Sequence, residues 1–232
     1  MGEAVSYELG DGIASISMDD GKVNALSLGM LAELDAALDQ AGDDGAAVVI
    51  TGRSGVFSAG FDLKVLRSGG EAARTMLRQG FELAERLLCF PAPVVVACSG
   101  HALAMASFLL LSADYRIGAD GPFKIGPNEV AIGMVMPLTG VELCRQRLTP
   151  AHFNRAVANA EIYGPAGALE AGFLDRVVPA GDLAGTALEV AGALAALDRQ
   201  AHAATKLRVR DQALAAIRAA IAADDAAMAA SS

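Results

Sequence analysis

Short apolar runs alternate with segments of helical period along this chain, and this alternation constrains its fold most. The runs 46–51 and 94–98 are short and rich in valine, whereas 28–41 and 70–88 repeat apolar residues at helical spacing. Strands that alternate with helices pair in parallel through right-handed crossovers. The pattern therefore predicts an α/β fold in which loops at the strand ends hold the ligand.

Local signals mark both ends of the chain. Residues 5–18 alternate around the turn Gly10-Asp11-Gly12 and predict an antiparallel hairpin. Ser27 stands where a helix over 28–41 needs its N-cap. Roughly the last fifty residues are alanine-rich and helical in period, and Asp198 marks a break between two helices.

The middle of the chain is its most apolar part. Residues 104–112 carry almost only apolar, unbranched side chains, which predicts a helix buried on all sides, and a strand resumes at 115–117. The segment 52–60 before this region reads as a loop. With 53% hydrophobic and 19% charged residues, the chain fits one α/β unit with a substantial core. We expect a core domain over 1–180 and a C-terminal helical region over 181–232.

Charge and cysteine content argue against several functions. A formal net charge of −9 repels a phosphate backbone, and no basic stripe offsets it, so we expect no nucleic-acid partner. Cys89, Cys98 and Cys144 have no metal-ligand or CxxC spacing, which indicates buried thiols and no metal site. We find no uninterrupted apolar run of about eighteen residues and no basic leader, so we expect a cytoplasmic protein without a membrane contact.

Four motifs carry the residues that point to chemistry. They are NAL at 24–26, GVFSAGFDLK at 55–64, GHALAMASF at 100–108 and IGPNEV at 125–130. In this order they resemble the motifs of the enoyl-CoA hydratase/isomerase (crotonase) family over roughly residues 5–180, and collinear matches are far more specific than any single motif. The resemblance implies a spiral of ββα units with a helical C-terminal region, assembled as a homotrimer or a homohexamer.

The resemblance also implies an acyl-CoA site. The backbone N–H groups of Phe61 and Met105 would hold the thioester oxygen, and Glu129 would be the catalytic acid and base. Ala59 would contact the CoA moiety, and Lys64 would lie near its phosphates. The other implied groove residues are Lys22, Val23, Ala25, Gly60, Asp62, Leu63, Phe108 and Asn128. Coenzyme A is part of the substrate, so we expect no separate cofactor.

Enolate chemistry requires such donors. Removing a proton next to a thioester carbonyl places negative charge on its oxygen, and each preorganised donor stabilises that charge by about 3 kcal/mol. Met105 begins a predicted helix, whose free N–H groups and dipole favour an anion. The family has glycines where this chain has Ala104-Met105-Ala106, but a backbone N–H requires no particular side chain.

A single glutamate favours isomerisation over hydration. The first of the two hydratase glutamates falls on Phe108, whereas the second matches Glu129, a pattern that resembles the mitochondrial-type enoyl-CoA delta isomerases. Adding water requires groups that activate water and deliver a proton, whereas one base suffices to move a double bond. An apolar wall at Phe108 would exclude water and raise the pKa of Glu129 by desolvation.

Other interpretations stay open. Glu129 alone could bind the water for a slow hydration, the enolate site could serve another acyl-CoA reaction, or the chain could bind acyl-CoA without catalysis. Lys22 and Lys64 are alternatively plain surface charges. His101, His152 and His202 have no catalytic spacing, and Asp114 is expected to be structural at a helix-to-strand turn.

Overall fold

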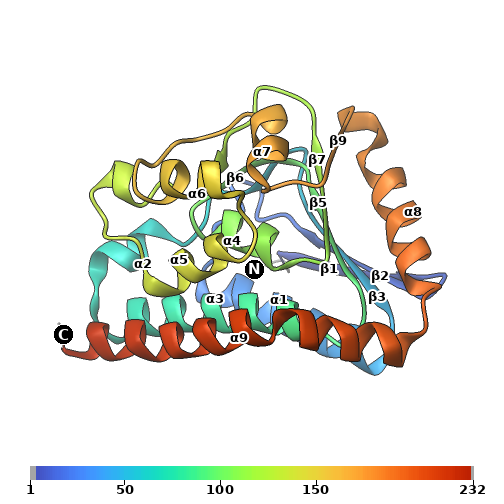
Figure 1. The fold of residues 1–232 in the computed structure, drawn as a ribbon, viewed down its shortest axis with the longest axis horizontal. Coiled ribbons are helices and arrows are strands. Elements are labelled where there is room, and N and C mark those ends of the chain that lie inside the picture. Colours follow the sequence, from blue (N-terminus) through green and yellow to red (C-terminus); the bar gives the residue numbers. More distant parts are fainter. Residues whose placement is uncertain (1–3, 231–232) are drawn as a thin grey trace.

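The computed structural model describes residues 4–230, in which helices surround two β-sheets (Figure 1). The strands are β1 (Val5–Gly10), β2 (Ile13–Met18), β3 (Ala47–Gly52), β4 (Gly55–Ser58), β5 (Val94–Cys98), β6 (Gly100–Leu103), β7 (Tyr115–Ala119), β8 (Ile125–Gly126) and β9 (Arg176–Val178). The helices are α1 (Leu28–Asp43), α2 (Leu63–Ser68), α3 (Gly70–Cys89), α4 (Met105–Ser112), α5 (Leu138–Arg145), α6 (Pro150–Val157), α7 (Pro165–Ala171), α8 (Leu183–Ala195) and α9 (Arg199–Ala230), with short 3-10 turns η1 (Val130–Ile132) and η2 (Ala180–Asp182).

The strands form a larger and a smaller sheet. The larger sheet has six strands in the order β1-β2-β3-β5-β7-β9, and the smaller has three in the order β4-β6-β8. Strands β1 and β2 form the predicted antiparallel hairpin, and the other strand pairs are parallel. The prediction of a predominantly parallel α/β fold is confirmed.

Successive strand pairs divide between the two sheets. In β3-β4, β5-β6 and β7-β8, the first strand joins the larger sheet and the second joins the smaller. Helices α2 and α3 follow the first of these pairs, and α4 follows the second. Each pair is thus displaced by one strand position relative to the previous pair, which is the predicted ββα spiral.

The prediction of a loop over 52–60 was wrong, since residues 55–58 form β4. Pairing with β6 makes this glycine-containing segment a strand.

The alternation of side chains along the larger sheet separates two apolar cores. Val48 and Ile50 of β3 face the core that contains α1, α3 and α4. Val49 of the same strand and Val95 of β5 face the opposite core, which α8 covers (Figure 1). Both faces of the parallel sheet are therefore buried, as is usual for such sheets.

The helices predicted from the sequence are present. The Ser27 hydroxyl accepts a hydrogen bond of 3.2 Å from the N–H of Met30 and so caps α1. All residues of α4 are buried. Helices α8 and α9 meet at the predicted break around Asp198 with a bend of 100°. Among the described residues no single helix meets the length and hydropathy of a membrane span, although this bent pair does so by length and composition.

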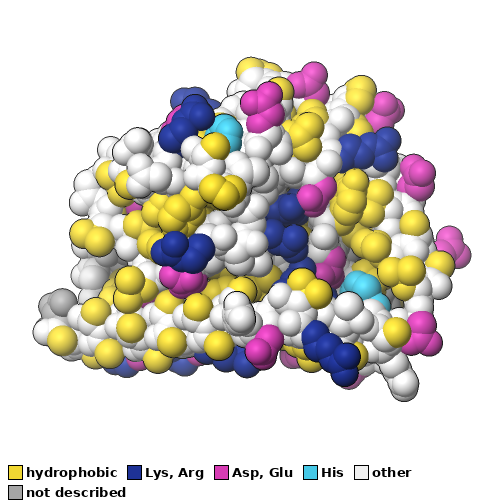
Figure 2. Space-filling view, viewed as in Figure 1, with side chains coloured by type: hydrophobic (Ala, Val, Ile, Leu, Met, Phe, Trp, Pro, Cys, Tyr) yellow, Lys and Arg dark blue, Asp and Glu magenta, His cyan; other side chains and the backbone are white. Residues whose placement is uncertain are grey.

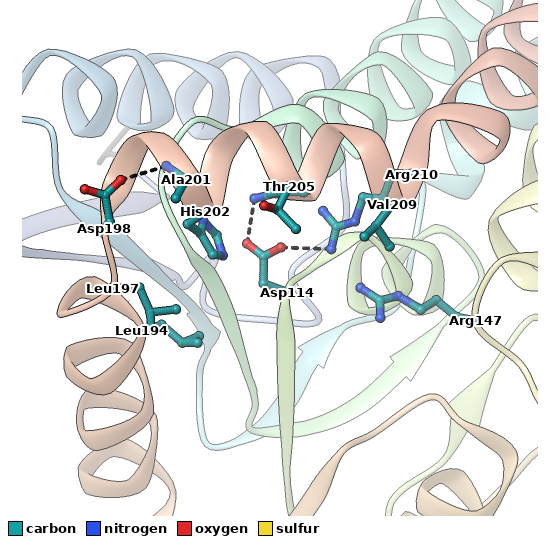
Figure 3. Close-up of a pocket in the computed structure, with 11 residues that line it drawn as sticks. Asp114, Arg147, Leu194, Leu197, Asp198, Ala201, His202, Thr205, Val209 and Arg210 are labelled. Carbon is teal, nitrogen blue, oxygen red and sulfur yellow. Dashed lines mark hydrogen bonds and ion pairs between the residues drawn. The ribbon is translucent and has the colours of Figure 1, made fainter.

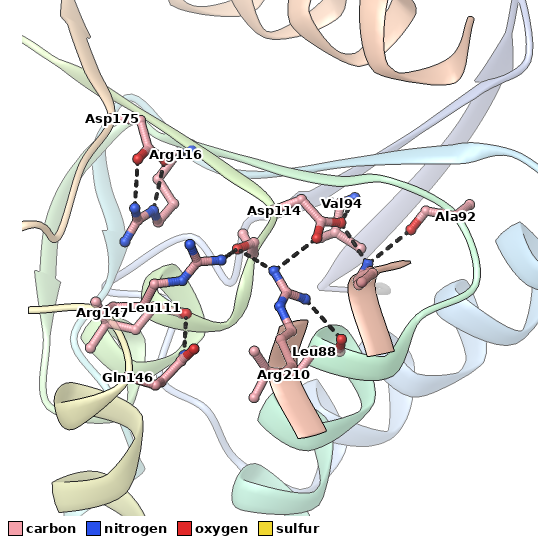
Figure 4. A network of polar contacts seen from close by, with 12 residues as sticks. Leu88, Ala92, Val94, Leu111, Asp114, Arg116, Gln146, Arg147, Asp175 and Arg210 are labelled. Carbon is pink, nitrogen blue, oxygen red and sulfur yellow. Dashed lines mark hydrogen bonds and ion pairs between the residues drawn. The ribbon is translucent and has the colours of Figure 1, made fainter. Parts of the chain in front are cut away.

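The long helix α9 is fixed to the core by buried ion pairs (Figure 4). Asp114 lies between α4 and β7. Its carboxylate accepts a hydrogen bond of 2.6 Å from the Lys206 ammonium and forms an ion pair of 2.8 Å with the Arg210 guanidinium. Its carboxylate also accepts the N–H of Val94 at 2.8 Å. The expectation of a structural role for Asp114 is confirmed, since this side chain links β5, the α4–β7 turn and α9.

Candidate functional site

The proposed site residues follow the three strands of the smaller sheet. Ala59 to Phe61 come after β4, Ala104 and Met105 come at the end of β6, and Asn128 and Glu129 come shortly after β8. The carboxyl ends of parallel strands lie at one edge of a sheet, where ligands of α/β proteins bind. The three motifs, far apart in sequence, therefore meet at this edge.

The segment around Asn24 supports the first of these loops. The Leu26 N–H donates to the Gly60 carbonyl at 2.9 Å, and the Ala59 N–H donates to the Val23 carbonyl at 3.0 Å. The Asn24 side chain is fully buried and donates to the carbonyls of Met18 and Phe57 at 2.9 and 3.1 Å. The NAL motif therefore has a structural function, which is to hold the loop at Gly60 in place.

Gly60 allows the first two loops to approach each other closely. It has φ +86°, and a Cβ at this position would lie 2.8 Å from the Ala104 Cβ and 3.2 Å from the Met105 nitrogen. Any side chain would therefore clash and also strain the backbone. The residue that precedes Phe61 thus lies directly beside the N–H group of Met105.

The N–H groups of Phe61 and Met105 are not used by the neighbouring secondary structure. The bridge between Leu26 and Phe61 consists of the Gly60 carbonyl and the Asp62 N–H, both bonded to Leu26. Met105 is the first residue of α4, so its N–H has no acceptor within the helix. Two adjacent loops thus each hold a backbone N–H group that the neighbouring helix and bridge do not use.

A cavity of about 80 Å³ lies beside these loops. Of the residues singled out in the sequence, Ala59, Phe61, Leu63, Asn128 and Glu129 line it. Sequence reasoning missed the other lining residues, which are Leu66, Leu77, Phe81, Ala104, Ile132, Met134 and Pro137. The helical period of α3 marks Leu77 and Phe81 as inward-facing, but no local signal tells that they face this cavity.

Glu129 is the acidic residue of this cavity. Its side chain is 6% exposed, and its Oε2 is buried without a hydrogen-bond partner among the described residues. Burial raises the pKa of Glu129 to about 7, although the N–H groups of Glu129 and Asn128 act in the opposite direction. A carboxylate with such a pKa can both accept and return a proton near neutral pH.

Phe108 and the Met105 side chain lie behind the cavity and do not line it. The Phe108 ring is fully buried, 6.1 Å from the ring of Phe81, which does line the cavity. The Met105 side chain is fully buried as well. The apolar wall expected at Phe108 is therefore formed by Phe81, with Phe108 packed behind it.

The other expected groove residues lie outside this cavity. Lys22, Val23 and Lys64 are exposed, and Ala25 is half-buried with its N–H donated to the Asp20 carboxylate at 3.1 Å. Asp62 caps α2 by accepting the Lys64 N–H at 2.8 Å. The hydrogen bond from the Ala59 N–H to the Val23 carbonyl holds Val23 beside the cavity. The expected groove for CoA would therefore leave the cavity at Val23. The contacts of Lys22 and Lys64 with CoA stay predictions.

A larger apolar cavity of about 470 Å³ adjoins the first. Both cavities are lined by Leu77, Phe81, Met134 and Pro137. Helix α9 forms the far wall through Ile221 and its neighbours, and the Asp224 carboxylate holds the start of α5 by accepting the Thr139 N–H at 2.9 Å. Among the described residues, no group of three or more His, Cys, Asp or Glu side chains is arranged to bind a metal.

This combination defines the class of the protein. A ββα spiral that joins two donor loops and a buried carboxylate at the edge of a small parallel sheet is the crotonase architecture. The family model for enoyl-CoA hydratase/isomerase matches residues 8–231. The chain belongs to the enoyl-CoA hydratase/isomerase family, whose members act on acyl-CoA thioesters.

Relatives with both activities resemble the chain. The mitochondrial enoyl-CoA delta isomerase 1 of Homo sapiens is 32% identical over 211 residues, which cover 89% of this chain and 70% of that protein. A probable enoyl-CoA hydratase of Mycobacterium tuberculosis is 29% identical over 175 residues, 74% of this chain and 67% of that protein. The apo structure of a Mycobacterium tuberculosis enoyl-CoA isomerase superimposes with a TM-score of 0.94 at 49% identity, covering 97% of this chain and 99% of that one.

Proposed function

We propose that the protein converts a 3-enoyl-CoA into the 2-enoyl-CoA, with Glu129 as its single acid and base. The supporting observation is that Glu129 is the sole carboxylate among the described residues lining the catalytic cavity. The other lining side chains, apart from Asn128, are apolar. Hydration calls for a second group to activate water or deliver a proton, whereas isomerisation does not.

The proposed reaction has two proton transfers. The ionised Glu129 carboxylate removes a proton from C2 of the 3-enoyl thioester, and the resulting dienolate carries its negative charge on the thioester oxygen. The N–H groups of Phe61 and Met105 donate to that oxygen, which would lower the barrier by about 3 kcal/mol per donor. Protonated Glu129 then returns the proton to C4, which yields the conjugated 2-enoyl thioester.

The substitution Glu129→Gln tests this role. Glutamine keeps the size of the side chain but cannot accept the proton, so isomerisation should fall by about two to four orders of magnitude. Acyl-CoA affinity should change little. The absorbance of the conjugated thioester, which rises as a 3-enoyl-CoA is consumed, measures the rate, and titration with a saturated acyl-CoA measures binding.

The same assay separates the alternatives. A fall of the absorbance with a 2-enoyl-CoA, and no rise with a 3-enoyl-CoA, would show a hydratase, like the probable enoyl-CoA hydratase of Mycobacterium tuberculosis that is 29% identical. Binding without either change would show a non-catalytic acyl-CoA-binding protein. Isomerisation by the Glu129→Gln variant within a few-fold of the unmodified rate would mean that another residue is the base.

We propose further that the acyl chain extends into the larger apolar cavity. Because Leu77, Phe81, Met134 and Pro137 border both cavities, an acyl group beside Glu129 has its continuation there. Ala223 of α9 lines the larger cavity, while its neighbour Ala222, which is exposed as Ala223 is, does not. The apolar wall favours a hydrocarbon chain over a polar acyl group.

Two matched α9 variants test the position of the acyl chain. Ala223→Phe should lower kcat/KM for a long-chain 3-enoyl-CoA by about tenfold and leave kcat/KM for a short-chain substrate unchanged. The reason is that a few methylene groups of the long chain would lose their burial, which costs about one to a few kcal/mol. Ala222→Phe should leave both unchanged. Equal loss with short and long substrates would place the acyl chain elsewhere.

The homotrimeric or homohexameric assembly and the cytoplasmic location stay predictions, and light scattering tests the assembly.

A further inference from the structure

A second large cavity lies where α9 begins, next to the end of α8 (Figure 3). Its volume is about 510 Å³, and it shares no lining residue with the cavity of Glu129. Its charged lining residues are Asp114, Arg147, Asp198, Lys206 and Arg210, and Leu194, Leu197 and Val209 form an apolar wall. The acyl-CoA chemistry proposed above does not use any of these residues.

Positive charge exceeds negative charge around this cavity. Lys206 and Arg210 share the single carboxylate of Asp114, at 2.6 and 2.8 Å. Arg116 behind them is paired with Asp175 at 2.6 Å. Figure 4 shows Arg147 between these two groups. Among the described residues, no carboxylate lies within ion-pair distance of Arg147, so four cations and two carboxylates meet at this end of the cavity.

Asp198 does not balance this excess charge. It borders the cavity at its other end, where its carboxylate accepts the Ala201 N–H at 2.7 Å and caps α9. On the face shown in Figure 2, basic side chains gather in a hollow above α9. The local charge is thus opposite to the formal net charge of −9 of the whole chain.

Arg147 has unused hydrogen-bonding capacity. One terminal nitrogen of its guanidinium donates to the Ala113 carbonyl at 2.7 Å, while its Nε is buried without a partner among the described residues. Burial, followed by repulsion from Arg116 and Arg210, lowers the pKa of Arg147 to about 10 despite the attraction of Asp175 and Asp114. The Nδ1 of His202, which also lines the cavity, is buried and has no hydrogen-bond partner in residues 4–230.

We propose that this cavity is a binding site for an anion of the phosphate class, held by Arg147 and separate from the acyl-CoA site. A phosphate anion offsets the excess positive charge at the Arg147 end of the cavity and accepts several hydrogen bonds from a guanidinium. It also relieves the repulsion among the cations. The apolar wall of Leu194, Leu197 and Val209 leaves room for the organic part of a phosphate monoester.

Calorimetric titration with inorganic phosphate, in a buffer without other multivalent anions, tests the proposal. The unmodified protein should bind one phosphate per chain and gain thermal stability on binding. Arg147→Gln should weaken the affinity about tenfold or more, the value of a hydrogen bond to a charged group. Arg147→Lys keeps the positive charge, so its phosphate affinity should fall less than that of Arg147→Gln. Arg145→Gln is the matched control, because Arg145 is 57% exposed and pairs with Glu142 outside the cavity.

Two further measurements make the test decisive. Saturating coenzyme A should leave phosphate affinity unchanged, whereas competition would assign these cations to the substrate's own phosphates and overturn the proposal. Light scattering of Arg147→Gln should show an unchanged mass. A loss of assembly, without phosphate binding by the unmodified protein, would mean that a carboxylate of a second copy pairs with Arg147. Phosphate affinity that is equal in Arg147→Gln and Arg145→Gln would also overturn it.

Discussion

At the scale of single residues, the environment of Glu129 determines what the site can do. Its carboxyl group lines the same cavity as Phe61, Phe81 and other apolar side chains, and burial raises its pKa to about 7. Among the described residues, its Oε2 has no hydrogen-bond partner and no cation lines the cavity to keep the carboxyl group ionised. A carboxylate in such surroundings is a stronger base than one in water.

The pH dependence of kcat/KM follows from this pKa. Glu129, the proposed base, must be ionised, so the rate with a 3-enoyl-CoA should rise about tenfold per pH unit below about pH 7 and level off above it. The residual rate of Glu129→Gln should not show this rise with pH. A limb centred near 4.5, the ordinary value of a glutamate, would show that the carboxyl group is solvated in the active enzyme.

The same pKa links stability to pH. The folded protein binds the Glu129 proton more tightly than the unfolded chain, in which the glutamate has its ordinary pKa of 4.5. Ionisation of Glu129 therefore destabilises the fold as pH rises from 4.5 through about 7. The cost is absent below pH 4.5 and amounts to about 3 kcal/mol above pH 7. Urea unfolding should therefore show that Glu129→Gln stabilises the protein more at pH 8 than at pH 5. An equal effect at both pH values would contradict the raised pKa.

At the scale of elements, the turn between β6 and α4 carries backbone strain at the proposed donor. Ala104 has φ +50° and ψ −127°, a conformation that glycine adopts far more readily than alanine. Its N–H donates to the Gly126 carbonyl of β8 at 3.2 Å, which holds the turn in this conformation. Sheet pairing thus maintains the strained turn that begins α4 at Met105.

The substitution Ala104→Gly should release this strain. We expect an increase of about 1 kcal/mol in the free energy of unfolding, since the relief exceeds the added entropy of the unfolded chain. The same chemical change at Ala106, which is fully buried within α4, should instead cost about 1 kcal/mol or more. Denaturant unfolding of both variants measures this. Equal destabilisation by the two changes would show that Ala104 is not strained.

At the scale of the whole molecule, α9 connects distant parts of the chain. Its first half reaches Asp114 through Lys206 and Arg210, and its second half covers the larger apolar cavity next to α3 and α5. Leu214 and Ile217 lie in the same core as α1 and α4. The C-terminal helical region therefore folds with the spiral and forms part of the wall of the proposed acyl pocket.

Removing the charge of Asp114 should destabilise the entire fold. In Asp114→Asn, two buried cations lose their carboxylate, for which about 3 kcal/mol or more is expected. Glu82→Gln is the comparison, because Glu82 forms an exposed i,i+4 pair with Arg78 and should cost about 0.5 kcal/mol or less. Thermal and urea unfolding test both. A small effect at Asp114 would mean that α9 is held by apolar packing alone.

The sequence by itself determined the local elements and the order of the motifs. Ser27 as a cap, the hairpin turn at Gly10-Asp11-Gly12, and the all-apolar segment that became α4 each depend on neighbours within one or two turns of chain. Periodicity and capping record such short-range preferences directly. The collinear motifs also indicated Glu129 and the two donor loops, because their order does not depend on how the strands pair.

Only the tertiary structure decided how these parts converge. The short segments β4, β6 and β8 become strands through pairing with one another, and this pairing places Gly60 against Ala104 and both beside Glu129. The cavity wall from α3, the position of Phe108 behind Phe81, and the gathering of Arg147 with Lys206 and Arg210 also arise from contacts between distant segments. A residue's own neighbours in sequence record that it will be buried, but which side chains it meets there is fixed by the packing of the entire chain.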